Sequence, residues 1–529
     1  MKSYKTLLIG LGGIAVLAAV LVPNAYFIQS VQPRPRGRPA ETDPGDVLKA
    51  RNRLVQAVTF KTVSAKPDSG PEFDKQKDFL RTEFQPLFSD PRVTVETISD
   101  RSLLVTWKGS DPSLPGVLLT AHLDVVPVEY DPSDKTSPET KGWDHDPFKD
   151  AGLDGIIWGR GTLDDKVSVL AILEAAEGLL RSGRKPARTL YFGFGQDEEI
   201  GGTKGATQIA ATLKKRLQGK KLECVIDEGT AIVSDFIPGL KRPIAPIGLV
   251  EKGYVDIILT ATGPGGHSSI APDRTAIGIL SQAIDRLERN PLPTEMPDIT
   301  RETLTTLAPE MGIDLRIVFA NLWLFRPLVL PVFAANPEMN AMVRTTAAVT
   351  VSKGGDKDNV LPETATAIVN FRILPGTTPS EVLEHVRQIV ADLKRVKVEI
   401  DPKNNFPPSH QSSTDTPSFR MLRQTIRDVF EKADPVVVPF LVTAGTDARF
   451  YEEICDNVYR FLPIQLKPDE LEMIHGVNEQ IRAQDYDQVV VFYRELMENA
   501  MRPDLGQNKW TGTLPGGKPT VEHEPSLGR

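Results

Sequence analysis

Two shortages limit what this chain can be. It has two cysteines in 529 residues, Cys224 and Cys455, too few for a disulfide scaffold or a zinc site built from thiolates, and we expect both to be buried thiols. It also has no long basic run, and its net charge is −8. Nucleic-acid binding needs clustered positive charge, so nucleic acid is not an expected partner. The absence of a Gly-x-x-x-x-Gly-Lys-Ser/Thr loop disfavours nucleotide chemistry.

The N-terminal end differs from the rest of the chain. A short basic segment, Met1–Lys5, precedes the apolar run Leu7–Val22, which with its continuation to residue 28 is long enough to cross a bilayer. Because no small-x-small cleavage site follows, an uncleaved anchor is favoured over a removed signal peptide. We therefore expect residues 1–30 to be a transmembrane helix that holds the catalytic part at a membrane, on its periplasmic or extracellular side. The arginines at 34, 36 and 38 oppose the usual charge bias and leave the orientation open.

Changes in pattern divide the remaining chain into five segments. Residues 31–45, rich in Pro, Arg and Gly, are expected to be a linker, and residues 503–529 a disordered tail. Alternating strands and helices predict an α/β catalytic domain in two parts, 46–250 and 403–502. Between them, 251–402 has the element order of a ferredoxin-like α+β domain and is expected to be an inserted lid. The clearest predicted elements are the strands 117–121, 190–194, 253–262 and 364–373 and the helix 166–181.

One segment of the inserted domain, 290–344, exceeds the minimal ferredoxin-like order. It contains the apolar run Leu322–Phe333, with a single charged side chain. One interpretation is a buried helix pair that closes the inserted domain. The other is an apolar wall for a greasy substrate, or a membrane-facing surface.

Histidine and carboxylate residues gather where three predicted strands and turns end. His122 and Asp124 leave the same face of one strand, Asp164 follows a glycine-rich turn, and Glu198-Glu199 follows another strand. Taken singly, these are a local hydrogen bond, a helix N-cap and a solvated helix start. Together they lie at the edge where α/β sheets keep their sites, and they predict two metal ions that share Asp164. Nitrogen and oxygen ligands without cysteine suit Zn²⁺, or a similar ion such as Co²⁺ or Mn²⁺.

Six short motifs resemble those of a known family. They are Ala121–Pro127, Trp158–Lys166, Asp197–Gly202, Val225–Gly229, Gly266–Ser269 and Ile474–Glu479. The chain resembles, over about residues 45–500, the dinuclear zinc exopeptidases and amidohydrolases of the aminoacylase, carboxypeptidase G and succinyl-diaminopimelate desuccinylase type. Within that family it looks closest to the carboxypeptidase S (Gly-Xaa carboxypeptidase) and N-fatty-acyl-amino acid synthase/hydrolase branches. The resemblance implies a mixed-sheet zinc exopeptidase catalytic domain with an inserted ferredoxin-like α+β lid domain.

The resemblance also implies which residues hold the metals. His122 and Asp227 would bind one zinc, Glu199 and His475 the other, and Asp164 would bridge both. Two such ions lower the pKa of a bridging water. The family's aminoacylase-like members carry Glu where this chain has Asp227, which favours the peptidase branch.

Three further residues are implied to act in catalysis. Asp124 would fix the tautomer of His122, Glu198 would be the general base, and His267 would be a second donor to the oxyanion. Without the resemblance, His267 beside two glycines would be interpreted as a turn histidine. Because it lies in the inserted domain, catalysis should require closure of that domain. In some relatives this histidine comes from a partner subunit, so both monomer and homodimer stay open.

Four residues are implied to recognise the substrate carboxylate. They are Asn359, Arg372, Gly445 and Thr446. For Arg372, a salt bridge at the rim is an equal alternative.

The function implied is zinc-dependent hydrolysis of an amide bond next to a free carboxylate. A carboxypeptidase or dipeptidase of the carboxypeptidase S type is the first hypothesis, acting on small peptides. The apolar insertion favours the alternative, an N-acyl (fatty-acyl) amino acid hydrolase/synthase. A membrane-tethered binding module on an inactive scaffold is a third class, which the retained Glu198 argues against.

Overall fold

The protein is built on a ten-stranded mixed sheet. The computed structural model describes residues 20–37, 43–128, 142–149, 152–235, 237 and 239–505. The sheet contains both antiparallel and parallel neighbours, which confirms the predicted α/β class with a mixed sheet. In spatial order the strands are β1 (Val93–Ile98), β2 (Ser102–Trp107), β6 (Leu190–Gly195), β3 (Val117–His122), β7 (Cys224–Asp227), β17 (Val458–Arg460), β9 (Ile244–Glu251), β8 (Ile232–Val233) and β18 (Gln465–Leu466), with β16 (Val436–Val442) paired to β9.

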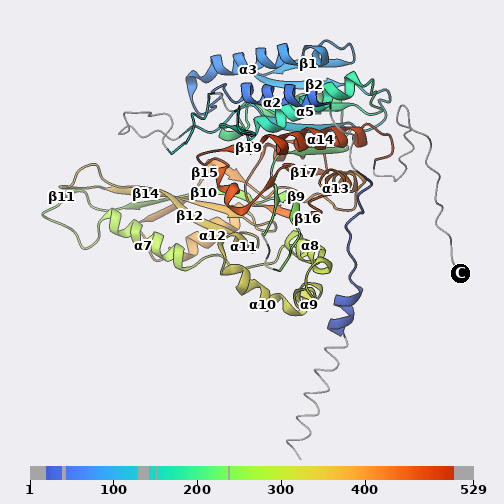
Figure 1. Ribbon diagram of the computed structural model, residues 1–529. Coiled ribbons are helices and arrows are strands. Elements are labelled where there is room, and N and C mark those ends of the chain that lie inside the picture. The colour runs from blue at the N-terminus through green and yellow to red at the C-terminus, as the bar shows by residue number, and fades with distance from the viewer. Residues whose placement is uncertain are drawn as a thin grey trace, which may run out of the picture.

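Both faces of the central strands are covered by helices (Figure 1). Along β3, Val117 and Leu119 pack into one apolar core, while Leu118 between them packs into another. Because neighbouring side chains of a strand point to opposite faces, each core lies on its own side of the sheet. Strands β6, β3 and β7 are parallel, so their carboxyl ends share one edge. One core holds α2 (Pro44–Ala57), α3 (Gly70–Glu83), α5 (Lys166–Arg181), α13 (Pro417–Val429) and α14 (Ala483–Ala500), and the other holds α6 (Ala206–Leu217).

A second sheet unit projects from the first (Figure 1). Its four antiparallel strands share an apolar core with two helices that includes Val255, Leu280 and Phe371. Far from the main sheet, β11 (Gly266–His267) pairs with β13 (Val360–Leu361). In chain order the unit consists of β10 (Gly253–Thr262), α7 (Ala276–Arg289), β12 (Thr346–Lys353), β14 (Thr364–Ile373), α12 (Pro379–Ile389) and β15 (Val396–Phe406).

The apolar insertion forms helices, but they do not close this second unit. Their core includes Ile244 of β9 and Val436 and Val438 of β16, so they lie against the catalytic sheet. The prediction of a helix pair closing the inserted domain thus differs from the structure, because periodicity gives a helix's apolar face and not its partner. The helices are α8 (Asp298–Leu307), α9 (Ile313–Ala320), α10 (Leu322–Ala334) and α11 (Pro337–Ala341).

The predicted linker 31–45 also differs from the structure where it is described. The Gln32 side chain donates to the Val437 carbonyl at 2.8 Å and accepts from the Val437 N–H at 2.9 Å, as a neighbouring strand would. Arg36 forms an ion pair of 2.7 Å with Asp428 of α13. Composition indicated an extended segment, but these side chains tie residues 31–37 to the catalytic domain. Residues 38–42 lie outside the described residues.

The predicted ends of the chain lie mostly outside the described residues. The structure does not describe residues 1–19 of the predicted anchor or residues 506–529 of the predicted tail. Residues 20–27 of the anchor are described, and they are helical. Within the described ranges no single helix is long and apolar enough to span a bilayer; α9 and α10 pass that test only as a pair, and they meet at 109°.

Candidate metal centre

Two histidines from distant parts of the chain face one aspartate. His122 ends β3, Asp164 lies in the turn before α5, and His475 follows the 3₁₀ helix η5 (Pro468–Met473). Asp164 Oδ1 lies 2.8 Å from His122 Nε2, and Asp164 Oδ2 lies 2.9 Å from His475 Nε2. Each carboxylate oxygen thus faces a different imidazole. A carboxylate that bridges two cations has this arrangement.

Glu199 and Glu228 complete this group. Glu199 Oε2 lies 3.2 Å from His475 Nε2, and Glu228 Oε1 lies 3.4 Å from His122 Nε2. Ligand atoms of His122, Asp164 and Glu199 all lie within 4.8 Å of one another. Each histidine therefore shares Asp164 and has one further carboxylate of its own.

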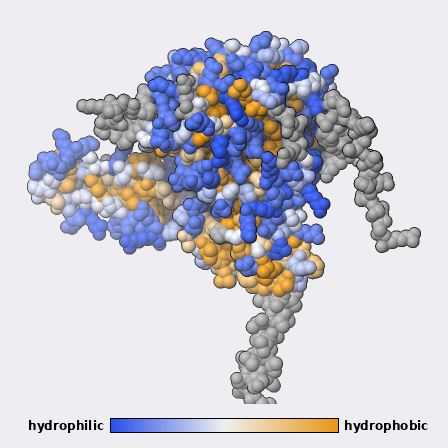
Figure 2. Space-filling model, viewed as in Figure 1, coloured by the Kyte–Doolittle hydropathy of each residue, from blue (hydrophilic) through white to orange (hydrophobic). Residues whose placement is uncertain are grey.

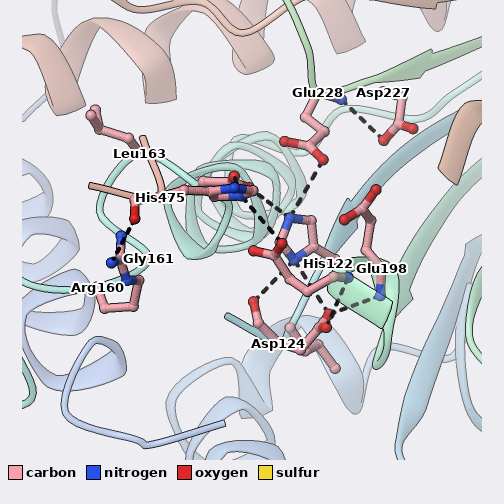
Figure 3. A network of polar contacts seen from close by, with 12 residues as sticks. His122, Asp124, Arg160, Gly161, Leu163, Glu198, Asp227, Glu228 and His475 are labelled. Atoms are coloured by element: carbon pink, nitrogen blue, oxygen red, sulfur yellow. Dashed lines mark hydrogen bonds and ion pairs between the residues drawn. The ribbon is translucent and has the colours of Figure 1, made fainter. Parts of the chain in front are cut away.

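Asp227, the implied ligand, is turned away from His122. Its Oδ1 accepts the backbone N–H of Glu228 at 3.0 Å, and its Oδ2 is buried without a hydrogen-bond partner. Figure 3 shows the Glu228 carboxylate, and not that of Asp227, linked to His122. Because two adjacent acids offer the same ligand chemistry, the sequence carried no signal that selects between them.

The electrostatics of the group suit cations. Burial raises the pKa of Glu228 well above its usual value, and the Asp164 charge adds to it; burial likewise raises the pKa of Asp227 to about 6. Hydrogen bonds to Asp164 and Glu199 raise the pKa of His475 to about 10. Buried carboxylates this close repel one another unless positive charge lies between them. The donors fit two divalent ions held by nitrogen and oxygen ligands.

Asp124 connects the histidine to the loop of the two glutamates. Its Oδ1 lies 3.3 Å from His122 Nδ1, and its carboxylate oxygens accept the backbone N–H groups of Glu198 and Glu199, each at 3.1 Å. The backbone carbonyl of Asp124 lies nearer to the same ring nitrogen, at 3.0 Å, and an acceptor on the second ring nitrogen fixes the tautomer of a metal-bound histidine. Asp124 therefore sets the position of one ligand, His122, and of the residues after β6.

Glu198 lies beside this group without a hydrogen bond drawn to its carboxylate (Figure 3). Burial raises its pKa well above the usual value, and the charges of Asp447 and Asp164 add to the effect. A carboxylate with high proton affinity next to the metal ligands is suited to accept a proton from water.

Glu479, whose role the sequence did not reveal, holds the turn that carries Asp164. It is fully buried, and its Oε1 accepts the backbone N–H groups of Gly161, Leu163 and Asp164 at 2.9, 2.8 and 3.2 Å. Its Oε2 accepts from Arg160 at 2.7 Å. Four donors to one carboxylate fix the glycine-rich turn. The sequence signal that could have indicated this role is that Glu479 lies in the same motif as His475.

The implied oxyanion donor, His267, lies apart from the candidate metal ligands. His267 is exposed on β11, and its Nδ1 lies 2.7 Å from Ser269 Oγ. Asn359 is exposed next to it, where its carbonyl accepts from the Ser268 N–H at 3.1 Å. Figure 1 places β11 at the far end of the second sheet unit. The structure thus brings His267 and Asn359 together, but it does not bring them to the metal ligands.

The other implied substrate residues lie near the base of that unit. Arg372 stacks on the Tyr254 ring, 4.6 Å from its centroid, and forms no salt bridge with any residue that the structure describes. Thr446 is buried, and its hydroxyl donates to Glu251 at 2.6 Å, while the neighbouring Gly445 is partly exposed. Arg449, which the sequence did not single out, lowers the pKa of Arg372 through its charge, although burial is the larger cause.

The two cysteines take no part in the centre. Cys224 and Cys455 are both free and buried, in agreement with the sequence prediction.

Comparison with known proteins assigns this centre to a family. The sequence pattern of Peptidase family M20/M25/M40 matches residues 118–499. The chain belongs to this family. It is 38% identical over 506 residues to "Probable carboxypeptidase S-like 2" of Dictyostelium discoideum, covering 94% of this chain and 93% of that protein. It is 41% identical over 449 residues to "N-fatty-acyl-amino acid synthase/hydrolase PM20D1" of Homo sapiens, covering 84% and 86%.

A solved structure shares the fold of this M20 chain. The M20 family metallo-carboxypeptidase Sso-CP2 from Sulfolobus solfataricus aligns with a TM-score of 0.62 at 19% identity, over 87% of this chain and 100% of that one. This likeness shows the fold, while the family match and the two relatives make the chain an M20 metallohydrolase.

The Glu479 contacts predict a loss of metal affinity in Glu479→Gln. An amide places an NH₂ group where a carboxylate oxygen now accepts N–H donors, which loosens the turn that presents Asp164. We expect the affinity for Zn²⁺ to fall roughly 10- to 100-fold, measured by competition with a chelator. Glu472→Gln, the same change at an exposed carboxylate of the same loop, should leave the affinity unchanged. Equal affinities in the two variants would contradict the role of Glu479.

Proposed function

We propose that the protein is a zinc-dependent hydrolase of N-acyl amino acids with aliphatic acyl chains. The observation that carries the proposal is an apolar cavity of ≈ 280 Å³ next to the metal ligands. Gly229 and Ile474 line it, and they are the chain neighbours of Glu228 and His475. Adjacent Cα atoms are about 3.8 Å apart, so a group bound there lies close to the metal centre.

The insertion supplies one wall of the cavity. Leu304 and Leu307 of α8, Phe333 of α10 and Met339 of α11 line it opposite Val438 of β16. Burial of one methylene group stabilises a complex by about 0.8 kcal/mol, which is roughly fourfold in affinity. An acyl chain in this cavity would therefore increase the affinity for a substrate whose amide bond lies at the metal ligands. The name of the relative in Homo sapiens, a fatty-acyl-amino acid synthase/hydrolase, supports this substrate class.

A carboxypeptidase or dipeptidase is the second candidate. It is favoured by similarity to the carboxypeptidase S-like protein over 94% of the chain. In that case an apolar residue of the peptide, in place of the acyl chain, would occupy the cavity.

Five residues would hold the metals. His122 and Glu228 would bind one Zn²⁺, Glu199 and His475 the other, and Asp164 both. Bound there, the ions supply a water of lowered pKa and polarise the amide carbonyl. Glu228 takes the place implied for Asp227, because its carboxylate is the one that faces His122.

The chain's other residues move the protons and position the substrate. Glu198 accepts the proton of the attacking water and returns it to the leaving nitrogen. Arg372 and Arg449 attract the free carboxylate of the amino acid, to which Asn359 and Gly445 add polar contacts. His267 donates to the oxyanion once the second sheet unit of this chain or of a second copy reaches the centre.

The cellular location belongs to the proposal as well. The apolar run Leu7–Val22 supports a catalytic part held at a membrane outside the cytoplasm.

Glu198→Gln tests the mechanism. An amide cannot take the proton, so we expect hydrolysis of an N-acyl amino acid to fall by about 10²- to 10⁴-fold, while the protein still binds zinc by elemental analysis. Glu431→Gln, an exposed glutamate after α13, should retain full activity. Undiminished turnover in Glu198→Gln would remove the mechanism.

Paired variants separate Glu228 from Asp227 as the ligand. Glu228→Gln should lose one of two zinc ions after dialysis against a weak chelator, because its carboxylate faces His122. Asp227→Asn should keep both, because its contact is to a backbone N–H. Zinc analysis showing the reverse pattern would restore Asp227 as the ligand.

The cavity predicts a dependence on chain length. We expect kcat/KM to rise roughly fourfold per methylene until the cavity is filled. Met339→Trp, which places an indole in the cavity from a partly exposed position, should lower kcat/KM for long acyl chains by about tenfold or more. The same variant should leave kcat/KM for N-acetyl substrates unchanged. The control Ile277→Trp on α7 should change kcat/KM for neither long-chain nor N-acetyl substrates. A flat chain-length profile, with turnover of dipeptides, would favour the second candidate.

A further inference from the structure

The outer face of α10 is apolar and has no partner among the described residues. Trp323, Leu328 and Val332 are 66%, 67% and 66% exposed, and they share that face with Pro327 and Pro331. Between Arg316 and Glu338 the chain has a single charged side chain, Arg326. Figure 2 shows the resulting hydrophobic surface at the end of the molecule where α9 and α10 lie. A contiguous apolar surface of this kind marks an interaction site.

The opposite face of the same helix is fixed in the protein. Leu322, Val329 and Phe333 are buried in the core shared with β9 and β16. A 13-residue helix is roughly 20 Å long, shorter than the roughly 30 Å of a bilayer's hydrocarbon core. Because α9 meets α10 at 109°, the pair forms a corner. Its geometry fits a helix lying on a membrane surface and does not fit a span.

The N-terminal segment adds to this surface. Asn24 Nδ2 donates to Asn321 Oδ1 at 2.8 Å, and Asn321 donates to the Leu21 carbonyl at 3.1 Å, so residues 20–27 are held at the start of α10. Tyr26 and Phe27 are 74% and 73% exposed. The apolar run Leu7–Val22 enters the described structure at this point.

We propose that this face, formed by α10, the α9 corner and residues 20–31, lies on a lipid bilayer. A bilayer is the partner that the chain itself indicates, because an apolar run long enough to span one leads into this face at Asn24. Trp and Tyr are the side chains that favour the membrane–water interface, and the stem of Arg326 can lie along lipid with its charge at the headgroups.

The placement has a consequence for the substrate, which rests on the proposed function. Val332 belongs to the outer face, while its neighbour Phe333 lines the apolar cavity. One helix therefore separates the bilayer from the acyl site. An amphiphilic substrate dissolved in the membrane would have a short path to the metals.

Spin labels measure the contact directly. Leu328→Cys and Val332→Cys, each labelled with a nitroxide in the full chain, are reconstituted into phosphatidylcholine–phosphatidylglycerol vesicles. The native cysteines are buried, so the unmodified chain serves as a blank. Leu48→Cys on α2, at a side chain that is 61% exposed, is the matched control, because α2 and α10 lie at opposite ends of the molecule (Figure 1).

We expect both α10 labels to be relaxed more by oxygen than by a water-soluble nickel chelate, and the Leu48 label to show the opposite. Labels at 328 and 332 as accessible to the chelate as the control would overturn the proposal. Dipolar broadening between two copies at Val332, in place of lipid exposure, would overturn it in favour of a dimer interface.

A second measurement concerns catalysis. Val332→Glu should lower kcat/KM for a long-chain N-acyl amino acid in vesicles by about tenfold and leave a short, soluble N-acyl amino acid unchanged. Equal kinetics of this variant and the unmodified protein on vesicles would refute delivery from the membrane. If the unmodified protein hydrolyses neither substrate, the proposed function fails, while the labelling result still decides the membrane contact.

Discussion

The structure depends on one partly buried carboxylate, Asp164, that faces two histidines contributed by segments far apart in the chain. His122 comes from a central strand and His475 from a loop near the end of the domain. Asp124 and Glu479 hold the loops that carry the other ligands, because their carboxylates accept backbone N–H groups of those loops. The positions of the ligands therefore depend on the backbone of these loops, which Asp124 and Glu479 fix although neither carboxylate has to bind a metal. The fold brings these loops together because the neighbouring strands β6, β3 and β7 are parallel, so all three end at the same edge of the sheet.

Much of this could be predicted from the sequence, and the exceptions have physical causes. The strands 253–262 and 364–373, in which apolar residues recur at alternate positions, have their predicted bounds, as does the helix 166–181. Strand β9 was missed although all eight of its residues are buried, because Pro246 and Gly248 interrupt its pattern. Gly248 is required there: a Cβ would lie 2.3 Å from a Val442 side-chain atom. Spacing grouped the ligand motifs, but it could not choose between Asp227 and Glu228, since only the contacts at the end of β7 show that the Glu228 carboxylate faces His122 while Asp227 accepts a backbone N–H.

The insertion illustrates a second limit of sequence patterns. Two interpretations were open for its apolar run, and the structure gives α10 a buried inner face and an exposed outer face, both apolar. A helix that is apolar all round is usually interior. Here one face closes a cavity beside the metals while the other remains uncovered by the described residues. Periodicity reports that both faces are apolar; only the packing of β9 and β16 against one of them shows which side belongs to the protein.

The connection between the two sheet units constrains how His267 can act. Four segments of chain cross between the units: Glu251–Gly253, the segment between α7 and α8, the segment between α11 and β12, and the segment after Phe406. The first and the last are bonded to each other, since Ser409 Oγ accepts the Glu251 N–H at 2.7 Å, and a Cβ on Gly253 would lie 2.6 Å from the Pro408 nitrogen. Glu251 is further fixed by Arg460 at 2.9 Å. Lys252, in the first crossing, also donates to the carbonyls of Ala341 and Arg344 beside the third, at 3.1 and 2.8 Å. Because the crossings are bonded to one another, an approach of His267 to the metal ligands of its own chain requires a movement of the second sheet unit against these contacts. An approach to the metal ligands of a second copy needs no such movement, because β11 projects from the end of the molecule.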